Sequence, residues 1–243
     1  FLLLLFIMAR LSVNINKVAT LRNARGGNIP NLVKAAVNCQ KYGADGITIH
    51  PRPDERHIRR NDVFEIKKVI TTEYNIEGYP SNAFIEMVLE VNPEQVTLVP
   101  DTPDVLTSCA GWDTIRDYVF LKEIINIFQE KGIRTSLFVE PKSAIIEGAK
   151  RCGAERIELY TEQYAINYYV DKKKAISPYL DAAQIAAELD LGINAGHDLN
   201  LDNLEFFSKE ITRLEEVSIG HALVSDALYL GLENTIQMYK RLL

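Results

Sequence analysis

The sequence predicts a single (β/α)8 TIM barrel, an α/β fold in which eight parallel strands alternate with eight helices. Short apolar segments rich in β-branched residues recur eight times along the 243 residues, with amphipathic stretches between them. Seven intervals of about 29 residues separate the centre of the first segment, residue 13, from that of the last, residue 217. That interval is the size of one strand plus one helix, and the chain length suits one barrel.

The short apolar segments predict the strands, and the amphipathic stretches between them predict the helices. We expect strands over residues 11–15, 46–49, 75–77, 95–99, 135–139, 156–160, 192–195 and 216–219. We expect helices over residues 31–42, 62–73, 82–91, 114–131, 143–152, 174–189, 201–209 and 222–243. Residues 20–27, 101–113 and 161–173 are expected to be loops, and the last two are long enough to cover a site or to bind substrate.

A doubly wound nucleotide-binding sheet is the weaker alternative fold. It would normally place a glycine-rich turn after its first strand, where residues 13–17 read VNINK. The composition is that of an ordinary globular protein, with 27 Lys and Arg against 33 Asp and Glu, a net charge of −6 and a pI of 5.4. This acidic balance argues against nucleic acid or an anionic membrane as a partner.

Cysteine usage and the N-terminal segment bear on location and on the domain boundary. Cys39, Cys109 and Cys152 are far apart and form no CxxC pair, which favours a reducing, cytoplasmic location over a disulfide framework. The first eight residues, FLLLLFIM, lack a basic region and a cleavage site and are too short to span a bilayer. We expect the barrel domain to cover residues 8–243, with residues 1–7 as a non-native or disordered extension. The alternative is that residues 2–7 lengthen the first strand.

Polar residues close several of the predicted strands, where barrel enzymes carry their reactive groups. They are Asn14, Asn16, His50, Glu77, Glu158, His197 and His221. A single histidine in this position can simply bond a backbone carbonyl, and Glu77 can be half of a structural ion pair. Several imidazoles and a carboxylate that share one pocket would instead form an acid/base set, with Glu77 facing the barrel mouth and His50 within reach.

Two glycine turns and several arginines favour anionic ligands. Gly196 precedes His197 and Asp198, and Gly220 precedes His221 at the start of the last helix, where backbone N–H groups can bind phosphate. Tight turns without a ligand are the alternative. Four arginines are expected on the same face of an acidic protein, which suggests one or more anionic substrates rather than a solvated loop. They are Arg22, Arg25, Arg52 and Arg56, and the fourth histidine, His57, lies beside them.

Metal and Schiff-base chemistry are disfavoured. A barrel metallohydrolase typically carries His-x-His at the end of its first strand, where this chain has Asn14 and Asn16. An enzyme-bound imine needs a buried lysine at a strand end, and only Lys17 comes near one. We therefore expect neither a metal site nor a covalent lysine intermediate.

Four motifs together resemble the pyridoxine 5′-phosphate synthase family over essentially all of residues 8–243. They are TLRNARG at 20–26, GADGITIH at 43–50, NAGH at 194–197 and IGHA at 219–222. The resemblance implies a (β/α)8 barrel that condenses two small phosphorylated substrates, 1-deoxy-D-xylulose 5-phosphate and 3-amino-2-oxopropyl phosphate, in the last ring-closing step of vitamin B6 synthesis. It also implies no cofactor and a homo-octamer.

The resemblance assigns roles to individual residues. It implies His50 and Glu77 as proton acceptors and His197 as the proton donor. The implied ligands of the amino-ketone phosphate are Asn14, Arg25, Asp198, Gly220 and His221, and those of deoxyxylulose phosphate are Arg52, His57 and Thr107. Two positions depart from the family pattern. Asn16 and Lys17 replace a common Asp-His pair, and Asp198 replaces a common Gly, so a phosphate contact there would use the backbone N–H with the carboxylate pointing away.

Two other functions remain open at this stage. A phosphosugar isomerase or epimerase would use the same residue types but would bind one phosphate. A catalytically silent barrel that binds a metabolite or serves assembly would convert nothing.

Overall fold

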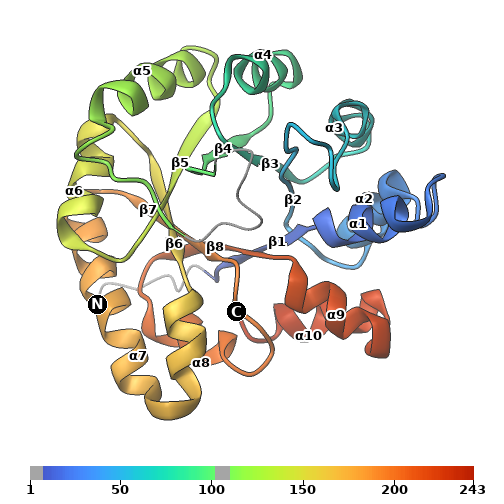
Figure 1. The fold of residues 1–243 in the computed structure, drawn as a ribbon. Coiled ribbons are helices and arrows are strands. Elements are labelled where there is room, and N and C mark those ends of the chain that lie inside the picture. Colours follow the sequence, from blue (N-terminus) through green and yellow to red (C-terminus); the bar gives the residue numbers. More distant parts are fainter. Residues whose placement is uncertain (1–7, 102–109) are drawn as a thin grey trace, which may run out of the picture.

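The structure, a computed structural model, describes residues 8–101 and 110–243, and a closed barrel of parallel strands lies at its centre (Figure 1). The strands are β1 (Arg10–Asn14), β2 (Gly46–Ile49), β3 (Glu73–Gly78), β4 (Gln95–Leu98), β5 (Arg134–Val139), β6 (Arg156–Tyr160), β7 (Gly192–Gly196) and β8 (Leu214–Ile219). Each pairs with the next and β8 pairs with β1, so Val13 lies between Ile47 and Ile219. The predicted TIM barrel is confirmed, with strand ends within two residues of those expected.

Helices surround the barrel on its outside (Figure 1). The described residues form α1 (Asn16–Arg25), α2 (Leu32–Lys41), α3 (Arg60–Lys67), α4 (Asn82–Val91), α5 (Tyr118–Gln129), α6 (Ser143–Cys152), α7 (Glu162–Glu188), α8 (Leu204–Glu210), α9 (His221–Leu230) and α10 (Leu232–Lys240). Their apolar faces pack against the outward-facing side chains of the strands. Leu11, Ile47 and Leu137 belong to this core and are fully buried.

Two of the predictions fall outside the described residues: the N-terminal extension at residues 1–7 and the site residue Thr107. Among the helices of residues 8–101 and 110–243, none combines the length and the hydrophobicity that a membrane span needs.

The prediction of a loop over residues 20–27 is wrong for most of that range, because residues 20–25 are helical. Helix α1 continues to Arg25 and ends at Gly26, whose φ of 76° suits glycine. Arg22 lies on the buried side of this helix and forms a two-pronged ion pair with Asp62, at 2.7 and 2.8 Å. A periodicity search counts such a residue as polar, so the buried face of α1 was not recognised.

The prediction of a loop over residues 161–173 is also wrong, because helix α7 begins at Glu162. The backbone leaves the helical conformation once, at Asp171, with φ −155° and ψ 96°. The Asp171 side chain accepts hydrogen bonds from the backbone N–H groups of Lys173 and Lys174, each at 3.1 Å. Asp171 therefore caps the second half of α7, which is the part that was predicted from residue 174 onward.

Two further helices differ from their expected ranges by more than four residues. The helix expected over residues 62–73 is α3, which ends at Lys67, and Glu73 already belongs to β3. The helix expected over residues 222–243 is divided into α9 and α10 at Gly231, whose φ is 81°. In each case a short turn interrupts a stretch whose apolar spacing looks continuous.

The inside of the barrel is polar, because alternate strand residues point inward and many of them are hydrophilic. The hydroxyls of Ser12 and Thr48 lie 2.7 Å apart, and Asn75 Nδ2 donates to Thr48 Oγ1 at 3.4 Å. Thr97 Oγ1 donates to Asn75 Oδ1 at 3.0 Å. Glu77 is two residues beyond Asn75 and so lies on the same side of β3, at the end where the strands finish.

Candidate active site

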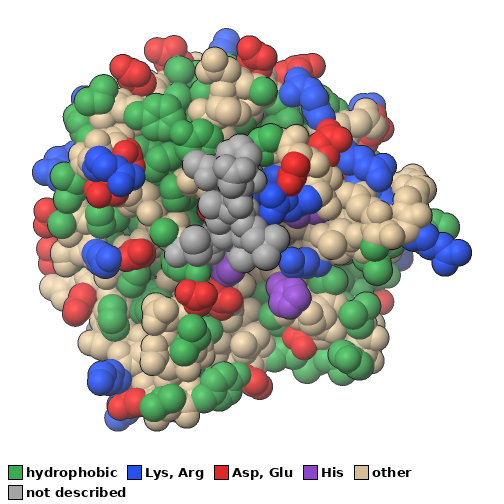
Figure 2. Space-filling view, viewed as in Figure 1, with side chains coloured by type: hydrophobic (Ala, Val, Ile, Leu, Met, Phe, Trp, Pro, Cys, Tyr) green, Lys and Arg blue, Asp and Glu red, His purple; other side chains and the backbone are tan. Residues whose placement is uncertain are grey.

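A cavity of about 720 Å³ opens where the strands end and connect to the following helices. Histidine, lysine and arginine side chains gather near the centre of the face shown in Figure 2. The lining residues are Asn14, Asn16, Lys17, Thr20, His50, Arg52, Arg56, His57, Glu77, Val99, Phe138, Glu158, His197, Asp198, Asn200, Ser218, Gly220, His221 and Ala222. All four histidines of the chain are among them.

His50 and Glu77 approach each other from adjacent strands. His50 directly follows β2 and Glu77 lies near the end of β3, and both are almost completely buried. His50 Nδ1 lies 3.9 Å from Glu77 Oε2, which is too long for a direct hydrogen bond. Both side chains can therefore contact the same atom of a third molecule.

Burial makes both of these groups neutral near pH 7. It raises the pKa of Glu77 to about 8, a rise that a hydrogen bond from Ser218 opposes and the carboxylate of Asp101 supports. It lowers the pKa of His50 well below the ordinary value for histidine, and the positive charge of Arg52 lowers it further. Glu77 is then a carboxylic acid and His50 an unprotonated base. An acid beside a base is what proton transfer to and from a bound substrate requires.

Glu158 is a further acidic group of the site; the sequence places it at the end of a predicted strand but assigns it no catalytic or binding role. It is a buried residue of β6, and its Oε2 has no hydrogen-bond partner among the described residues. Burial and the nearby Glu77 raise the pKa of its carboxyl group. The signal was a charged residue inside the apolar strand segment RIELY, because an ionised carboxylate is costly in such a setting.

Asn14 and Asn16 connect the end of β1 to this acid/base pair. Asn14 Nδ2 donates to Glu77 Oε2 at 3.4 Å, and its Oδ1 accepts from the Asn16 backbone N–H at 3.0 Å. Asn16 Oδ1 accepts from the backbone N–H of His50 at 2.9 Å. The Asn16 side chain therefore holds the His50 backbone, while the neighbouring Lys17 lines the cavity.

His197 and Asp198 form a second pair after β7. His197 Nδ1 lies 2.7 Å from Asp198 Oδ2, and each side chain is about a third exposed, 33% and 32%. Asp198 lines the cavity, and its carboxylate contacts the His197 ring. Burial lowers the pKa of His197, but the hydrogen bond and negative charge of Asp198, together with Glu158 and Glu162, raise it above the ordinary value. His197 thus holds a proton more strongly than His50.

The turn after β8 leads directly into α9 at the edge of the cavity. Gly220 precedes this helix, and no side chain caps its first turn, which begins with His221 and Ala222. A Cβ atom on Gly220 would lie 3.1 Å from Cβ and Cγ of Asn14, so glycine permits the close approach of the two segments. The uncapped N–H groups and the helix dipole make this corner suitable for an anion.

A cluster of basic side chains, Lys17, Arg52, Arg56 and His57, lines another part of the cavity. Arg52 Nη2 donates to Asp101 Oδ2 at 2.6 Å, and both side chains are buried. Burial and the nearby charges of Arg52 and Lys17 lower the pKa of His57 to about 4. His57 Nδ1 accepts from the Ile58 backbone N–H at 2.9 Å, so in neutral His57 the ring proton lies on Nε2. The cluster offers donors and positive charge to an anionic ligand.

Two of the expected arginines do not line the cavity. The Arg22 side chain is 2% exposed and forms an ion pair with Asp62. The prediction that Arg22 contributes to an anion site is therefore wrong, and the residue has a structural role. Arg25 is exposed at the end of α1 and is absent from the cavity lining.

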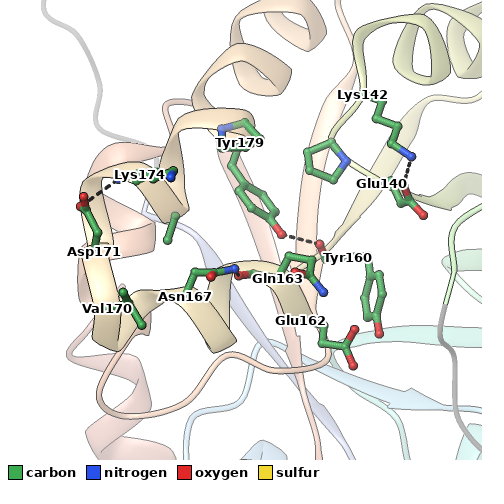
Figure 3. A pocket seen from close by; sticks show the side chains of 13 residues that line it. Glu140, Lys142, Tyr160, Glu162, Gln163, Asn167, Val170, Asp171, Lys174 and Tyr179 are labelled. Carbon is green, nitrogen blue, oxygen red and sulfur yellow. Dashed lines mark hydrogen bonds and ion pairs between the residues drawn. The ribbon is translucent and has the colours of Figure 1, made fainter.

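A second cavity, of about 540 Å³, lies between the connection after β5 and the two halves of α7 (Figure 3). Tyr160 lines it, and the hydroxyl of Tyr179 donates to the Tyr160 backbone carbonyl at 2.8 Å. The Tyr160 ring also packs edge-on against the His197 ring, with centroids 5.5 Å apart. Tyr160 therefore connects the walls of this cavity to the surroundings of His197.

The barrel and its cavity identify a TIM-barrel enzyme whose site combines acid/base side chains with two places suited to anions. No cluster of three His, Cys, Asp or Glu side chains that could hold a metal ion occurs in the part of the chain that the structure describes. The chain belongs to the family of the pyridoxal phosphate biosynthesis protein PdxJ, whose profile matches residues 11–243.

Individual relatives agree with this membership. The chain is 61% identical over 232 residues to the pyridoxine 5′-phosphate synthase of Flavobacterium johnsoniae, covering 96% of this chain and 98% of that protein. It is also 61% identical over 236 residues to the pyridoxine 5′-phosphate synthase of Bacteroides fragilis, covering 97% and 100%. Phosphoribosylanthranilate isomerase from Thermotoga maritima has a similar structure, with a TM-score of 0.60 over 97% of this chain and 98% of that chain. At 15% identity that likeness concerns the fold alone.

Proposed function

We propose that this chain is a pyridoxine 5′-phosphate synthase. It would condense 1-deoxy-D-xylulose 5-phosphate with 3-amino-2-oxopropyl phosphate to give pyridoxine 5′-phosphate, phosphate and water. The observation that carries the proposal is the convergence of His50, Glu77 and His197 on one cavity that also has an uncapped helix start and a basic cluster. Membership of the PdxJ family and the names of the relatives support the same reaction.

The proposed chemistry needs proton transfer and no enzyme-bound imine. The amine of one substrate attacks the ketone of the other, so the imine forms between the substrates. Dehydration, loss of phosphate and ring closure then require protons to move on and off carbon and oxygen. His50, unprotonated because of its lowered pKa, would accept a proton first. His197 would donate one, and Glu77, whose pKa of about 8 is close to neutrality, would accept after it has lost its own proton.

The family resemblance suggests two phosphate positions, and the charges around the cavity support them. The amino-ketone phosphate would lie at the start of α9 against Gly220 and His221, with Asn14 and Asp198 beside it. The deoxyxylulose phosphate would contact Arg52 and His57 in the basic cluster. Roles for Arg25 and Thr107 rest on the family resemblance alone.

The family resemblance and the composition support four further proposals. The enzyme would work without a cofactor, as a homo-octamer, in the cytoplasm and without nucleic acid as a partner. Sedimentation of the purified protein tests the assembly directly.

The reaction can be tested by incubating the purified chain with both phosphates and with each one alone. We expect ultraviolet absorbance of a pyridine product and release of inorganic phosphate only when both are present. Conversion of one phosphate alone would point to an isomerase or epimerase. Absence of any conversion would leave a metabolite-binding barrel and would refute the proposed activity.

A further inference from the structure

His197 has a backbone conformation that needs support. Its φ is 81°, in the left-handed region where non-glycine residues are uncommon. Residues in such conformations persist only when surrounding contacts hold them there. The contacts around His197 therefore show which residues hold this backbone conformation in place.

Thr161 supplies the backbone contacts. It directly follows β6, is completely buried, and its hydroxyl donates to the carbonyl oxygen of Gly196. The same Oγ1 accepts from the backbone N–H of Asp198 at 3.3 Å. A hydroxyl carries one donor and two acceptor positions, so it can make both bonds at once. Thr161 thus connects the two residues that flank His197 in the chain.

Neighbouring aromatic residues hold Thr161 and the imidazole in place. The Tyr179 hydroxyl donates to the backbone carbonyl of Tyr160, the residue before Thr161, at 2.8 Å (Figure 3). The Tyr160 ring lies edge-on to the His197 ring, at an interplanar angle of 84°. Both the backbone and one side of the imidazole are therefore fixed by the end of β6.

Asp198 fixes the orientation of the ring. Its Oδ2 lies 2.7 Å from His197 Nδ1, which leaves Nε2 as the nitrogen that is not bound to Asp198. The other titratable groups that act on the imidazole are Glu158 of β6, Glu162 of α7 and His50 after β2. Of these carboxylates, only Asp198 is hydrogen-bonded to the imidazole in the described contacts.

We propose that Asp198 and Thr161 are positioning residues for His197: Thr161 holds its backbone, and Asp198 binds Nδ1–H so that Nε2–H is presented to the substrate. This inference rests on the proposed function, in which His197 donates a proton. In that step the Nε2–H bond breaks and an O–H bond forms on a substrate oxygen that leaves as water. The imidazolium thereby becomes a neutral imidazole whose Nδ1–H stays bound to the Asp198 carboxylate, and Nε2 regains a proton from solvent before the next turnover.

The Asp198 half of the proposal is tested with a probe that does not depend on turnover. Diethyl pyrocarbonate modifies unprotonated histidine, so its rate at His197 as a function of pH, followed by peptide mass spectrometry, gives the pKa of that residue. In Asp198→Asn we expect this pKa to fall and the alkaline limb of the kcat profile to move to lower pH by the same amount. We also expect kcat to fall about 10- to 100-fold, the range found when the hydrogen-bond partner that orients a metal-bound histidine is removed.

The matched control is Asp202→Asn. Asp202 is an exposed carboxylate of the same connection, it accepts a hydrogen bond from Tyr169, and it does not line the cavity. The change should leave both the His197 pKa and kcat unchanged. An unaltered His197 pKa in Asp198→Asn would overturn the proposed pairing. A lowered pKa with wild-type kcat at every pH would support the pairing and instead refute His197 as the proton donor of the proposed function.

The Thr161 half is tested with Thr161→Val and Thr161→Ser. Valine keeps the shape and removes both hydrogen bonds, so we expect kcat to fall at least about 10-fold with little change in either KM, whereas serine restores kcat. Wild-type kcat in the valine variant, or equal loss in the serine variant, would overturn the role of the hydroxyl. If the valine variant does not fold, Thr161→Ala provides the comparison with serine.

Discussion

His50 Nδ1 and Glu77 Oε2 lie 3.9 Å apart at the ends of neighbouring strands, yet the two side chains do not form an ion pair near pH 7. Burial raises the pKa of Glu77 to about 8 and lowers that of His50, so the proton stays on the carboxyl group. A buried ion pair would indicate a structural role for these residues. A neutral acid and a neutral base can instead each exchange a proton with a substrate.

The first prediction concerns Glu77→Gln. Glutamine keeps the shape of the side chain but cannot act as an acid or a base near neutral pH. We expect turnover to fall about 10²- to 10⁴-fold, with a melting temperature that is unchanged or raised, because functional carboxylates are often held at a cost to stability. Single-turnover rates and thermal unfolding of one preparation measure both effects.

Glu216→Gln is the matched control for that change. Glu216 is also buried with a pKa raised to about 8, but it belongs to the network of Arg10 and Gln95 inside the barrel and does not line the cavity. We expect turnover to stay close to that of wild type, because Glu216 does not line the cavity. If Glu77→Gln instead lost about 3–5 kcal/mol of stability and kept its turnover, Glu77 would be a structural ion-pair partner.

The second prediction concerns the dependence of stability on pH. The pKa of Glu77 is about 8 in the folded protein against an ordinary value of 4.5. Its stabilising contribution is complete below pH 4.5 and is lost as the pH rises through 8, because the unfolded carboxyl group releases its proton first. The melting temperature of Glu77→Gln should therefore rise relative to wild type between pH 5 and pH 8. A difference that does not vary with pH would contradict the raised pKa.

A third prediction concerns the anion position at the start of α9. In crystals grown with sulfate or phosphate, an anion should lie within about 2.7–3.2 Å of a backbone nitrogen near His221. Gly220→Ala places a Cβ 3.1 Å from Asn14 and should raise KM for the amino-ketone phosphate about tenfold, or about 1.4 kcal/mol. KM for the other phosphate should remain near wild type and serves as the internal control. A liganded crystal without an anion in this corner would remove the assignment.

A fourth prediction separates structural from ligand-binding arginines. Arg22→Ala leaves Asp62 without its two-pronged partner and should destabilise the fold by about 3–5 kcal/mol. Arg60→Ala removes an exposed pair with Glu90 at 3.6 Å and should cost less than about 1 kcal/mol. Denaturant unfolding compares the two. Normal stability of the Arg22 variant together with a large rise in KM would restore Arg22 to the anion site.

The fifth prediction concerns metal and lysine chemistry. Dialysis against a chelator should leave turnover unchanged, and borohydride in the presence of substrates should trap no enzyme adduct. Mass spectrometry of the intact chain detects an adduct directly. Inactivation that a divalent ion reverses, or a covalent product at Lys17, would contradict this expectation.

The fold and much of the site were predictable because both follow from local patterns. Short apolar, β-branched segments separated by helical stretches predict the barrel, and the strand ends bring His50, Glu77 and His197 to one face. Helix α1 was missed because its buried residue Arg22 is charged. Only the contact with Asp62, 40 positions later, makes that burial tolerable, and a local window does not include it.

The fold class, the family motifs and the residue types at the strand ends can all be predicted from the amino-acid sequence, since these depend on spacing along the chain. The raised pKa of Glu77, the pairing of His197 with Asp198 and the support of that pair by Thr161 depend on the folded structure. Desolvation and hydrogen bonds between distant segments arise only after packing. The same residue types could otherwise have been ion pairs or solvated side chains.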